Sequence, residues 1–137
     1  MTTHRIVKTL TANDTGETGG HQSGLLIPKL PRLLAFFPEL DSSAYNPRVH
    51  LKFIDESGSF WEFAFIYYNN RFHGGTRNEY RLTRMTRYIR NARLGVGDEV
   101  ILSRLEGRYR IAHMRTRQAA VNDGVLRLGN GWRVVQI

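Results

Sequence analysis

The sequence predicts a mainly β protein, with its strands arranged as an antiparallel barrel or sandwich and with two short helices. Three observations lead to this fold class. Short runs rich in β-branched and aromatic residues recur along the chain. Glycine and other turn-forming residues separate these runs at close spacing. Apolar or basic residues at helical spacing are confined to two short segments, so a sheet that curls or stacks on itself is expected.

The N-terminal third is predicted to contain two strands and one helix. Residues 6–10 form a β-prone run, and residues 24–27 form a returning strand. Residues 11–22 lie between them as a polar loop that contains three glycines. Apolar side chains at roughly helical spacing predict a short helix over residues 28–40, with Pro31 tolerated in its first turn.

The remainder of the chain is predicted to be mostly sheet. Residues 49–54 and 60–68 should form a hairpin, because the link between them, residues 56–59, has turn chemistry. Residues 83–91 carry arginines at three-residue spacing and predict a second short helix with a basic face. Further short strands, bounded by glycines, are expected at residues 100–102, 109–112 and 133–137.

Length and composition suggest one domain spanning residues 1–137. A chain of this size can bury a core without crosslinks, and the sequence contains no cysteine. No apolar run approaches the roughly 18 residues of a membrane span, and Met1 to Arg5 are not followed by an apolar signal region. We therefore expect a cytoplasmic protein that does not bind membranes and is a monomer as an isolated domain.

Charge indicates a polyanionic partner. The formal net charge is +8, and only three of the 20 basic residues are lysines. A GC-rich genome enriches arginine too, but the guanidinium fork also matches phosphate and guanine bidentately. The segment from Arg71 to Arg93 has seven arginines and a single acid, Glu79. Arginine reads guanine, asparagine reads adenine and glutamate reads cytosine in the major groove, so we predict specific binding of double-stranded DNA.

Signatures of catalysis are missing from the sequence. The glycine-rich residues 16–20 are not followed by the Gly-Lys-Ser/Thr of a phosphate-binding loop. The five histidines have no metal-ligand spacing, and no Asp/Glu-x-Lys triplet accompanies the 12 acidic residues. We expect no cofactor, no metal, no catalytic residue and no cleavage of DNA by this chain alone.

Two polar segments resemble the N-terminal DNA-binding domain of EcoRII-type restriction endonucleases. They are residues 11–22 and residues 67–84, the second of which contains Thr76-Arg77-Asn78-Glu79-Tyr80-Arg81. Residues 97–100, Gly-Asp-Glu-Val, suit the DNA-binding pseudobarrel that plant transcription factors of the B-three class also use. The resemblance covers nearly the whole chain in outline. It departs at Gly75, where the EcoRII-type domain has a lysine, so one phosphate or base contact of that family is in question.

The resemblance implies a seven-stranded open pseudobarrel that grips duplex DNA like a wrench. An N-terminal arm and a C-terminal arm would both enter the major groove, and the EcoRII target is CCWGG, where W is A or T. It further implies that the chain is the N-terminal part of a larger prokaryotic type II restriction endonuclease, whose nuclease domain is covalently linked.

Residues of the C-terminal arm can be given roles from their chemistry. Arg77, Glu79 and Arg81 share one side of an extended strand, because side chains alternate with period two. The two arginines would donate to guanine and Glu79 would accept from a cytosine amino group, or else Glu79 would hold the arginines by a salt bridge. Asn78 points the other way and supports the loop or contacts adenine. Arg71 and Arg84 are expected to bind phosphates.

The N-terminal arm contributes a second set of candidates. His21 is expected to contact DNA, since a histidine after two glycines in a polar loop is poorly placed for a core. Lys8 is expected to reach a base or phosphate. Capping of turns is the favoured role of the short polar side chains in this arm, with DNA contact as the other reading. The full set comprises Lys8, Asn13, Asp14, Thr15, His21 and Gln22.

Other functions compete with a restriction recognition module. The same barrel would suit a stand-alone transcription-factor-like or methylation-sensing domain. Single-stranded nucleic-acid binding would be favoured if exposed aromatic residues made the contacts; Tyr67, Tyr68, Trp61 and Trp132 are instead expected to pack in the barrel. A nuclease in its own right would need an unrecognised acid pair.

Overall fold

The structure is built around one curled sheet. The computed structural model of the chain describes residues 4–16, 24–115, 126–127 and 131–135. The strands are β1 (His4–Thr9), β2 (Leu25–Ile27), β3 (Arg48–Ile54), β4 (Phe60–Tyr68), β5 (Glu79–Thr83), β6 (Glu99–Leu105), β7 (Arg108–Met114), β8 (Leu126–Arg127) and β9 (Trp132–Val134). The helices are α1 (Ala12–Thr15), α2 (Pro31–Leu34) and α3 (Thr86–Asn91), with a 3-10 helix, η1 (Asn70–His73). Within the described residues the strand order is β2-β5-β4-β3-β7-β6-β1-β9-β8.

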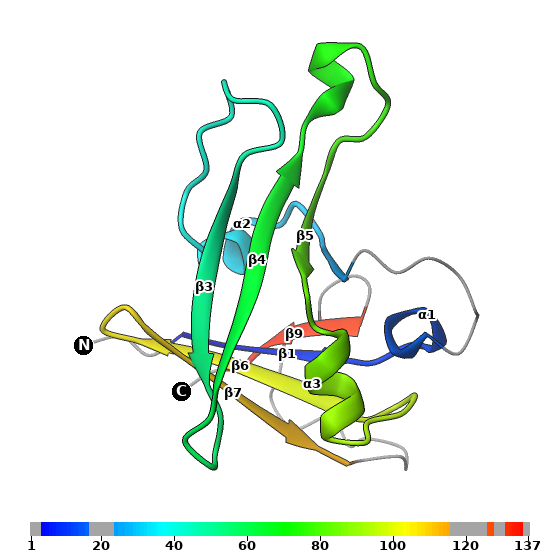
Figure 1. Ribbon diagram of the computed structural model, residues 1–137, viewed down its shortest axis with the longest axis vertical. Coiled ribbons are helices and arrows are strands. Elements are labelled where there is room, and N and C mark those ends of the chain that lie inside the picture. The colour runs from blue at the N-terminus through cyan, green and yellow to red at the C-terminus, as the bar shows by residue number, and fades with distance from the viewer. Residues whose placement is uncertain (1–3, 17–23, 116–125, 128–130, 136–137) are drawn as a thin grey trace.

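The sheet bends so that two groups of strands cross. β3, β4 and β5 rise along the long axis of the molecule, whereas β1, β6, β7 and β9 run across it (Figure 1). A short parallel pairing of β3 with β7 joins the groups, with Phe53 opposite Tyr109. The indole N–H of Trp132 on β9 donates to the carbonyl of Leu26 at 2.9 Å, which links β2, at one edge of the sheet, to the strand next to the other edge. The predicted mainly β, open pseudobarrel is confirmed.

The element count differs from the prediction. The described residues contain nine strands and three α-helices, instead of seven and two. β5 was expected as the extended strand that carries Glu79 and Arg81, but it was not counted among the barrel strands; only Leu82 of it is buried. α1 is a single turn, capped by Thr11. The helix expected over residues 28–40 is confined to α2, because the amide of Phe36 already bonds the carbonyl of Leu33, three residues back, and the chain turns into the core.

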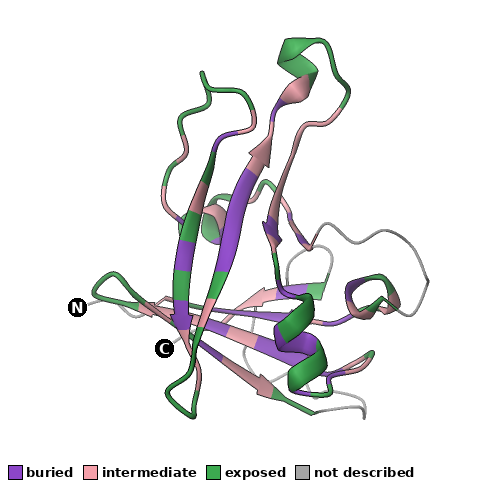
Figure 2. Cartoon of the chain, in the orientation of Figure 1, coloured by how far each residue is buried: buried purple, intermediate pink, exposed green. Residues whose placement is uncertain are grey.

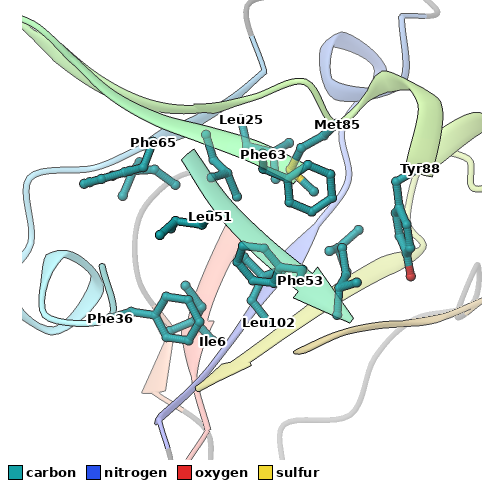
Figure 3. Close-up of a cluster of buried hydrophobic side chains, with 14 of the residues drawn as sticks. Ile6, Leu25, Phe36, Leu51, Phe53, Phe63, Phe65, Met85, Tyr88 and Leu102 are labelled. Carbon is teal, nitrogen blue, oxygen red and sulfur yellow. The ribbon is translucent and has the colours of Figure 1, made fainter. Parts of the chain in front are cut away.

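Side chains from most strands meet in one core (Figure 3). Phe53, Phe63 and Leu102 are fully buried, and each such side chain contributes about 1.5 to 3 kcal/mol. Phe36, which follows α2, and Tyr88 of α3 lie on opposite sides of this cluster. The β3–β4 hairpin predicted from the sequence supplies much of it, in a register that pairs residues 48–54 with residues 60–66. The hairpin prediction is therefore confirmed.

β4 and β5 continue outward from the core into the C-terminal arm, residues 67–84, which returns to the core at Leu82 (Figure 1). Their antiparallel register places Tyr68 opposite Glu79. Aromatic rings stack along the inner side of the arm, with centroid separations of 5.6 Å for Phe65 and Tyr80 and 4.3 Å for Tyr67 and Tyr80. This stack extends apolar packing from the core into the arm. The opposite side of β5 carries polar side chains.

A buried asparagine fastens the neighbouring loop to the arm. Asn69 is 0% exposed, and its side-chain oxygen accepts from the amide of Asn46 at 2.7 Å. Its side-chain nitrogen donates to the carbonyls of Ser42 and Ala44, at 3.1 and 2.7 Å. The Asn46 side chain in turn accepts from the Asn69 amide at 3.1 Å. These bonds satisfy the loop's backbone, so the loop is held at the base of η1.

Replacing Asn69 with alanine should lower the free energy of unfolding by about 1 to 3 kcal/mol, because three backbone groups of the loop lose the buried side chain that pairs with them. Urea unfolding followed by circular dichroism measures this loss. Asn91→Ala, at an exposed position of α3, is the matched control and should change the free energy little. Equal effects of the two substitutions would contradict the role given to Asn69.

Candidate nucleic-acid interface

Three charged side chains form a row on the outer side of β5 and the residues just before it. A single carboxylate oxygen of Glu79 lies 3.5 Å from a terminal nitrogen of Arg77 and also accepts a hydrogen bond from Nε of Arg81. The side chains of Arg77, Glu79 and Arg81 are 36%, 29% and 19% exposed. We call these three residues the arginine row. The alternation expected from the sequence places them together, and the salt bridges expected as one reading of Glu79 are present.

The guanidinium of Arg77 lies over an aromatic ring. Its central carbon is 3.7 Å from the ring centroid of Tyr68, the residue opposite Glu79. A guanidinium stacked on a ring is attracted to it, and its N–H groups, which lie in the guanidinium plane, stay available to donate hydrogen bonds. The backbone is fixed as well, since the Arg77 amide donates to the side-chain oxygen of Asn70 at 2.6 Å and its carbonyl accepts from the Arg71 amide at 2.9 Å. Arg77 is thus held before any ligand arrives.

The carboxyl group of Glu79 is held in its ionised form. Partial burial raises its pKa, but the hydrogen bond and charge of Arg81, followed by those of Arg77, act in the opposite direction and lower it overall. A carboxylate between two guanidinium groups offsets their mutual repulsion. The row therefore presents alternating donors and an acceptor along one strand.

The described part of the N-terminal arm forms a tight turn. Thr11 caps α1 by a reciprocal pair of bonds with Asp14: the Thr11 amide donates to the carboxylate at 2.9 Å, and the Asp14 amide donates to the Thr11 hydroxyl at 3.3 Å. The carboxylate also binds the ammonium of Lys8 at 3.1 Å. Lys8 is 3% exposed and Asp14 is 8% exposed. Lys8 is thus held in a buried ion pair, because the turn folds Asp14 back over β1. Its expected contact with DNA stays a prediction.

A recess joins the two arms. It has a volume of about 170 Å³ and is lined by Lys8, Thr11, Asn13, Asp14, Leu26 and Arg81. Arg81 closes one side, where its guanidinium donates to the carbonyl of Gly24 at 3.2 Å. Gly24 has φ of +85°, and a Cβ atom there would lie 2.1 Å from the carbonyl oxygen of Leu82. Only glycine fits this close approach of the returning chain to β5.

The other predicted site residues have distinct surroundings. Asn78 accepts a hydrogen bond from the Tyr67 hydroxyl at 2.7 Å, as a loop-supporting residue would. Thr15 donates to the carbonyl of Ala12 at 3.2 Å. Arg71 is exposed at the end of the arm, and Arg84 is 59% exposed with Glu62 at 3.5 Å. His21 and Gln22 lie outside the described residues.

Sequence reasoning missed two supporting residues of the row. Tyr68 was expected to pack in the barrel or its rim. Its position beside the row follows from the pairing of β4 with β5, which places it opposite Glu79. Asn70 was not singled out, although its side chain fixes the Arg77 backbone. Gly75 permits this contact, since a Cβ atom at position 75 would lie 2.6 Å from the Asn70 side-chain oxygen. Both residues could have been found from the sequence, because they lie just before the arginine-rich segment.

The described residues contain no group of three or more His, Cys, Asp or Glu side chains arranged to hold a metal ion. Among them, no helix is long and apolar enough to cross a membrane.

A curled, mainly β sheet that carries an arginine row on a projecting arm is the architecture expected of a DNA-binding pseudobarrel. The family described as "Restriction endonuclease EcoRII, N-terminal" matches residues 2–94, and the chain belongs to that family. The family resemblance predicted from the sequence is thereby confirmed.

Two curated relatives agree with this assignment. The chain is 46% identical over 83 residues to the type II restriction enzyme EcoRII of Escherichia coli, an alignment that covers 57% of this chain and 20% of the enzyme. It is 31% identical over 107 residues to a B3 domain-containing protein of Oryza sativa subsp. japonica, covering 77% of this chain and 34% of that protein. The aligned region is thus a fifth to a third of the length of these relatives.

Acid should weaken the folded state partly through Glu79. Because its pKa is lowered on folding, the ionised carboxylate stabilises the fold above its ordinary pKa, and this contribution is lost as the pH falls through the folded value. Glu79→Gln should therefore flatten the dependence of the free energy of unfolding on pH between about pH 5 and about pH 3. Urea titrations across this window measure it, with exposed Glu106→Gln as control. An unchanged pH dependence in Glu79→Gln would remove Glu79 as a contributor.

Proposed function

We propose that this chain binds double-stranded DNA in a sequence-specific manner and serves as the recognition module of a type II restriction endonuclease. The observation that carries the proposal is the arginine row. Two arginines and one glutamate on one strand face are the side chains that read guanine and cytosine edges in the major groove. Membership of the EcoRII N-terminal family supports the restriction context.

The reading groups of the row lie close together. Arg77 and Arg81 both contact the same carboxylate oxygen of Glu79, so the three side chains would address neighbouring base pairs. We propose that both arginines donate to guanine O6 and N7 and that Glu79 accepts from cytosine N4. A CCWGG-like site meets this demand, since C·G pairs flank its centre.

The N-terminal arm would approach the same groove from the side of the recess. Asn13 lines that recess together with Arg81. We propose that Asn13 and Thr15, with His21 and Gln22 farther along the arm, contact DNA directly. Lys8 and Asp14 would act indirectly, because their buried ion pair shapes the turn that presents the arm. Asn78 would support the opposing loop.

Affinity would come mainly from charge. The net charge of +8 attracts a polyanion, and the exposed Arg71 and Arg84 are suited to phosphate contacts that carry no sequence information. Arg84 is less available for a phosphate contact than Arg71, since it forms an ion pair with Glu62. Binding should consequently fall with rising salt at every sequence, whereas the arginine row sets the preference among sequences.

The proposal assigns cleavage to another part of the protein. The restriction enzyme that the chain resembles is about five times as long as the aligned segment. We propose that a covalently linked nuclease domain acts in the prokaryotic cytoplasm, that the present chain is a monomeric reader, and that it needs no cofactor to bind DNA. A second candidate is a transcription-factor-like domain without a nuclease, which the likeness to the rice B3 domain-containing protein favours.

Arg81→Ala should weaken binding to a CCWGG duplex by about 1 to 3 kcal/mol while random duplexes bind nearly as before, because a base contact is lost. Fluorescence anisotropy at fixed salt measures both affinities. Arg108→Ala removes the same charge from an exposed position on β7 and serves as the control. Equal losses of Arg81→Ala on both duplexes would make Arg81 a phosphate contact.

Glu79→Gln should relax discrimination at one C·G pair of the site. The amide that replaces the carboxylate can donate as well as accept, so the preference for a cytosine amino group is reduced. A panel of duplexes with single base-pair replacements measures this preference position by position. Unchanged discrimination at every position would leave Glu79 with only its salt-bridge role.

A further inference from the structure

The end of the C-terminal arm carries an exposed group of aromatic and basic side chains. We define the tip patch as Tyr45, Arg71, Phe72 and His73. Phe72 is 66% exposed and Tyr45 is 61% exposed, and Figure 2 shows η1 at the arm's end as largely exposed surface. The rings of Tyr45 and His73 meet edge to face with centroids 5.4 Å apart. The Arg71 guanidinium lies 6.0 Å from the Phe72 ring centroid.

The tip patch is held in place by the surrounding backbone. The Asn69 network fixes the loop that presents Tyr45, with its 2.7 Å bonds to Asn46 and Ala44. On the other side, Gly74 ends η1 with φ of +91°, and the Gly75 amide donates to the carbonyl of Asn70 at 2.7 Å. Two separate chain segments are therefore fastened together so that their aromatic residues face solvent. A fixed exposed surface loses little conformational freedom on binding a partner.

The patch is a direct continuation of the arginine row. The Arg71 amide donates to the Arg77 carbonyl at 2.9 Å, which ties the first turn of η1 to the end of the row. Because the patch lies beyond Arg77, at the end of the row, it would extend past the base edges that the row contacts and toward the groove wall. That wall is formed by deoxyribose rings and phosphates.

The chemistry of the patch matches that wall. Sugar rings offer apolar surface to an aromatic side chain, and phosphates attract arginine and histidine donors. Residues 69–78 contain no acidic side chain. We propose that the tip patch is a further DNA contact, in which Phe72 and Tyr45 pack against the sugar-phosphate backbone outside the base pairs that are read. This inference rests on the proposed function and adds a contact with flanking DNA to it.

The chain offers a closely matched control. Phe60 is 65% exposed, and the ammonium of Lys52 lies 5.4 Å from its ring centroid. Its exposure and its cationic neighbour thus resemble those of Phe72. Phe60 begins β4, however, at the end of that strand opposite the arm (Figure 1). Removing either ring changes surface hydrophobicity alike, and only one ring belongs to the proposed contact.

The test compares Phe72→Ala and Phe60→Ala on two duplexes that contain CCWGG, one with long flanks and one that ends directly outside the pentanucleotide. Phe72→Ala should weaken binding to the long duplex by about fivefold or more, the lower end of what an aromatic contact contributes to nucleic-acid binding. It should change binding to the short duplex little, and the order of preference among base replacements should be retained. Phe60→Ala should behave as the unsubstituted chain on both.

Each other result has a definite meaning. If Phe72→Ala and Phe60→Ala bind the long duplex equally well, the flanking contact is wrong while the proposed reading of bases stands. If Phe72→Ala loses as much on the short duplex as on the long one, the ring acts within the pentanucleotide and the flanking assignment is overturned. If the unsubstituted chain prefers no sequence at all, the proposed function fails, and the inference fails with it.

Discussion

The pairing of Arg77 and Arg81 around Glu79 is the interaction on which the rest of this site depends. Two guanidinium groups on one strand face repel each other, and an acid between them offsets that repulsion. The same carboxylate orients both forks. Without it, the arginines would be free to turn toward any phosphate, and the surface would attract DNA without distinguishing sequences. One acid among seven arginines thus converts a basic segment into an ordered set of donors and an acceptor.

The fold supplies the rigidity that this arrangement needs. β4 extends from the core as one continuous strand. Antiparallel pairing with β4 fixes the position of β5. Stacked rings from Phe65 outward stiffen the inner side of the arm. Tyr68 then supports Arg77 from the outer side. A reading surface on a supported strand is better defined than one on a loop, and here the support runs without a break from the core to the arm.

Much of the fold followed from the sequence, because its strongest signals are local. The β3–β4 hairpin was predictable from two aromatic and β-branched runs around a turn, and the arginine row from period-two alternation. What could not be predicted depends on contacts between distant residues. One such contact is the buried ion pair of Lys8 with Asp14, which the turn at α1 forms. The support that Tyr68 gives to Arg77 depends on the register between β4 and β5, which local sequence patterns do not set.

The most direct test of this account is a selection of binding sites from duplexes with randomised sequence, performed with the unsubstituted chain at near-physiological salt. The account predicts enrichment of one short motif whose preferred positions are C·G pairs adjacent to one another, as an arginine row around a single glutamate requires. Recovery of sequences with no shared motif, with binding that varies only with salt, would contradict it, because charge alone would then explain the attraction.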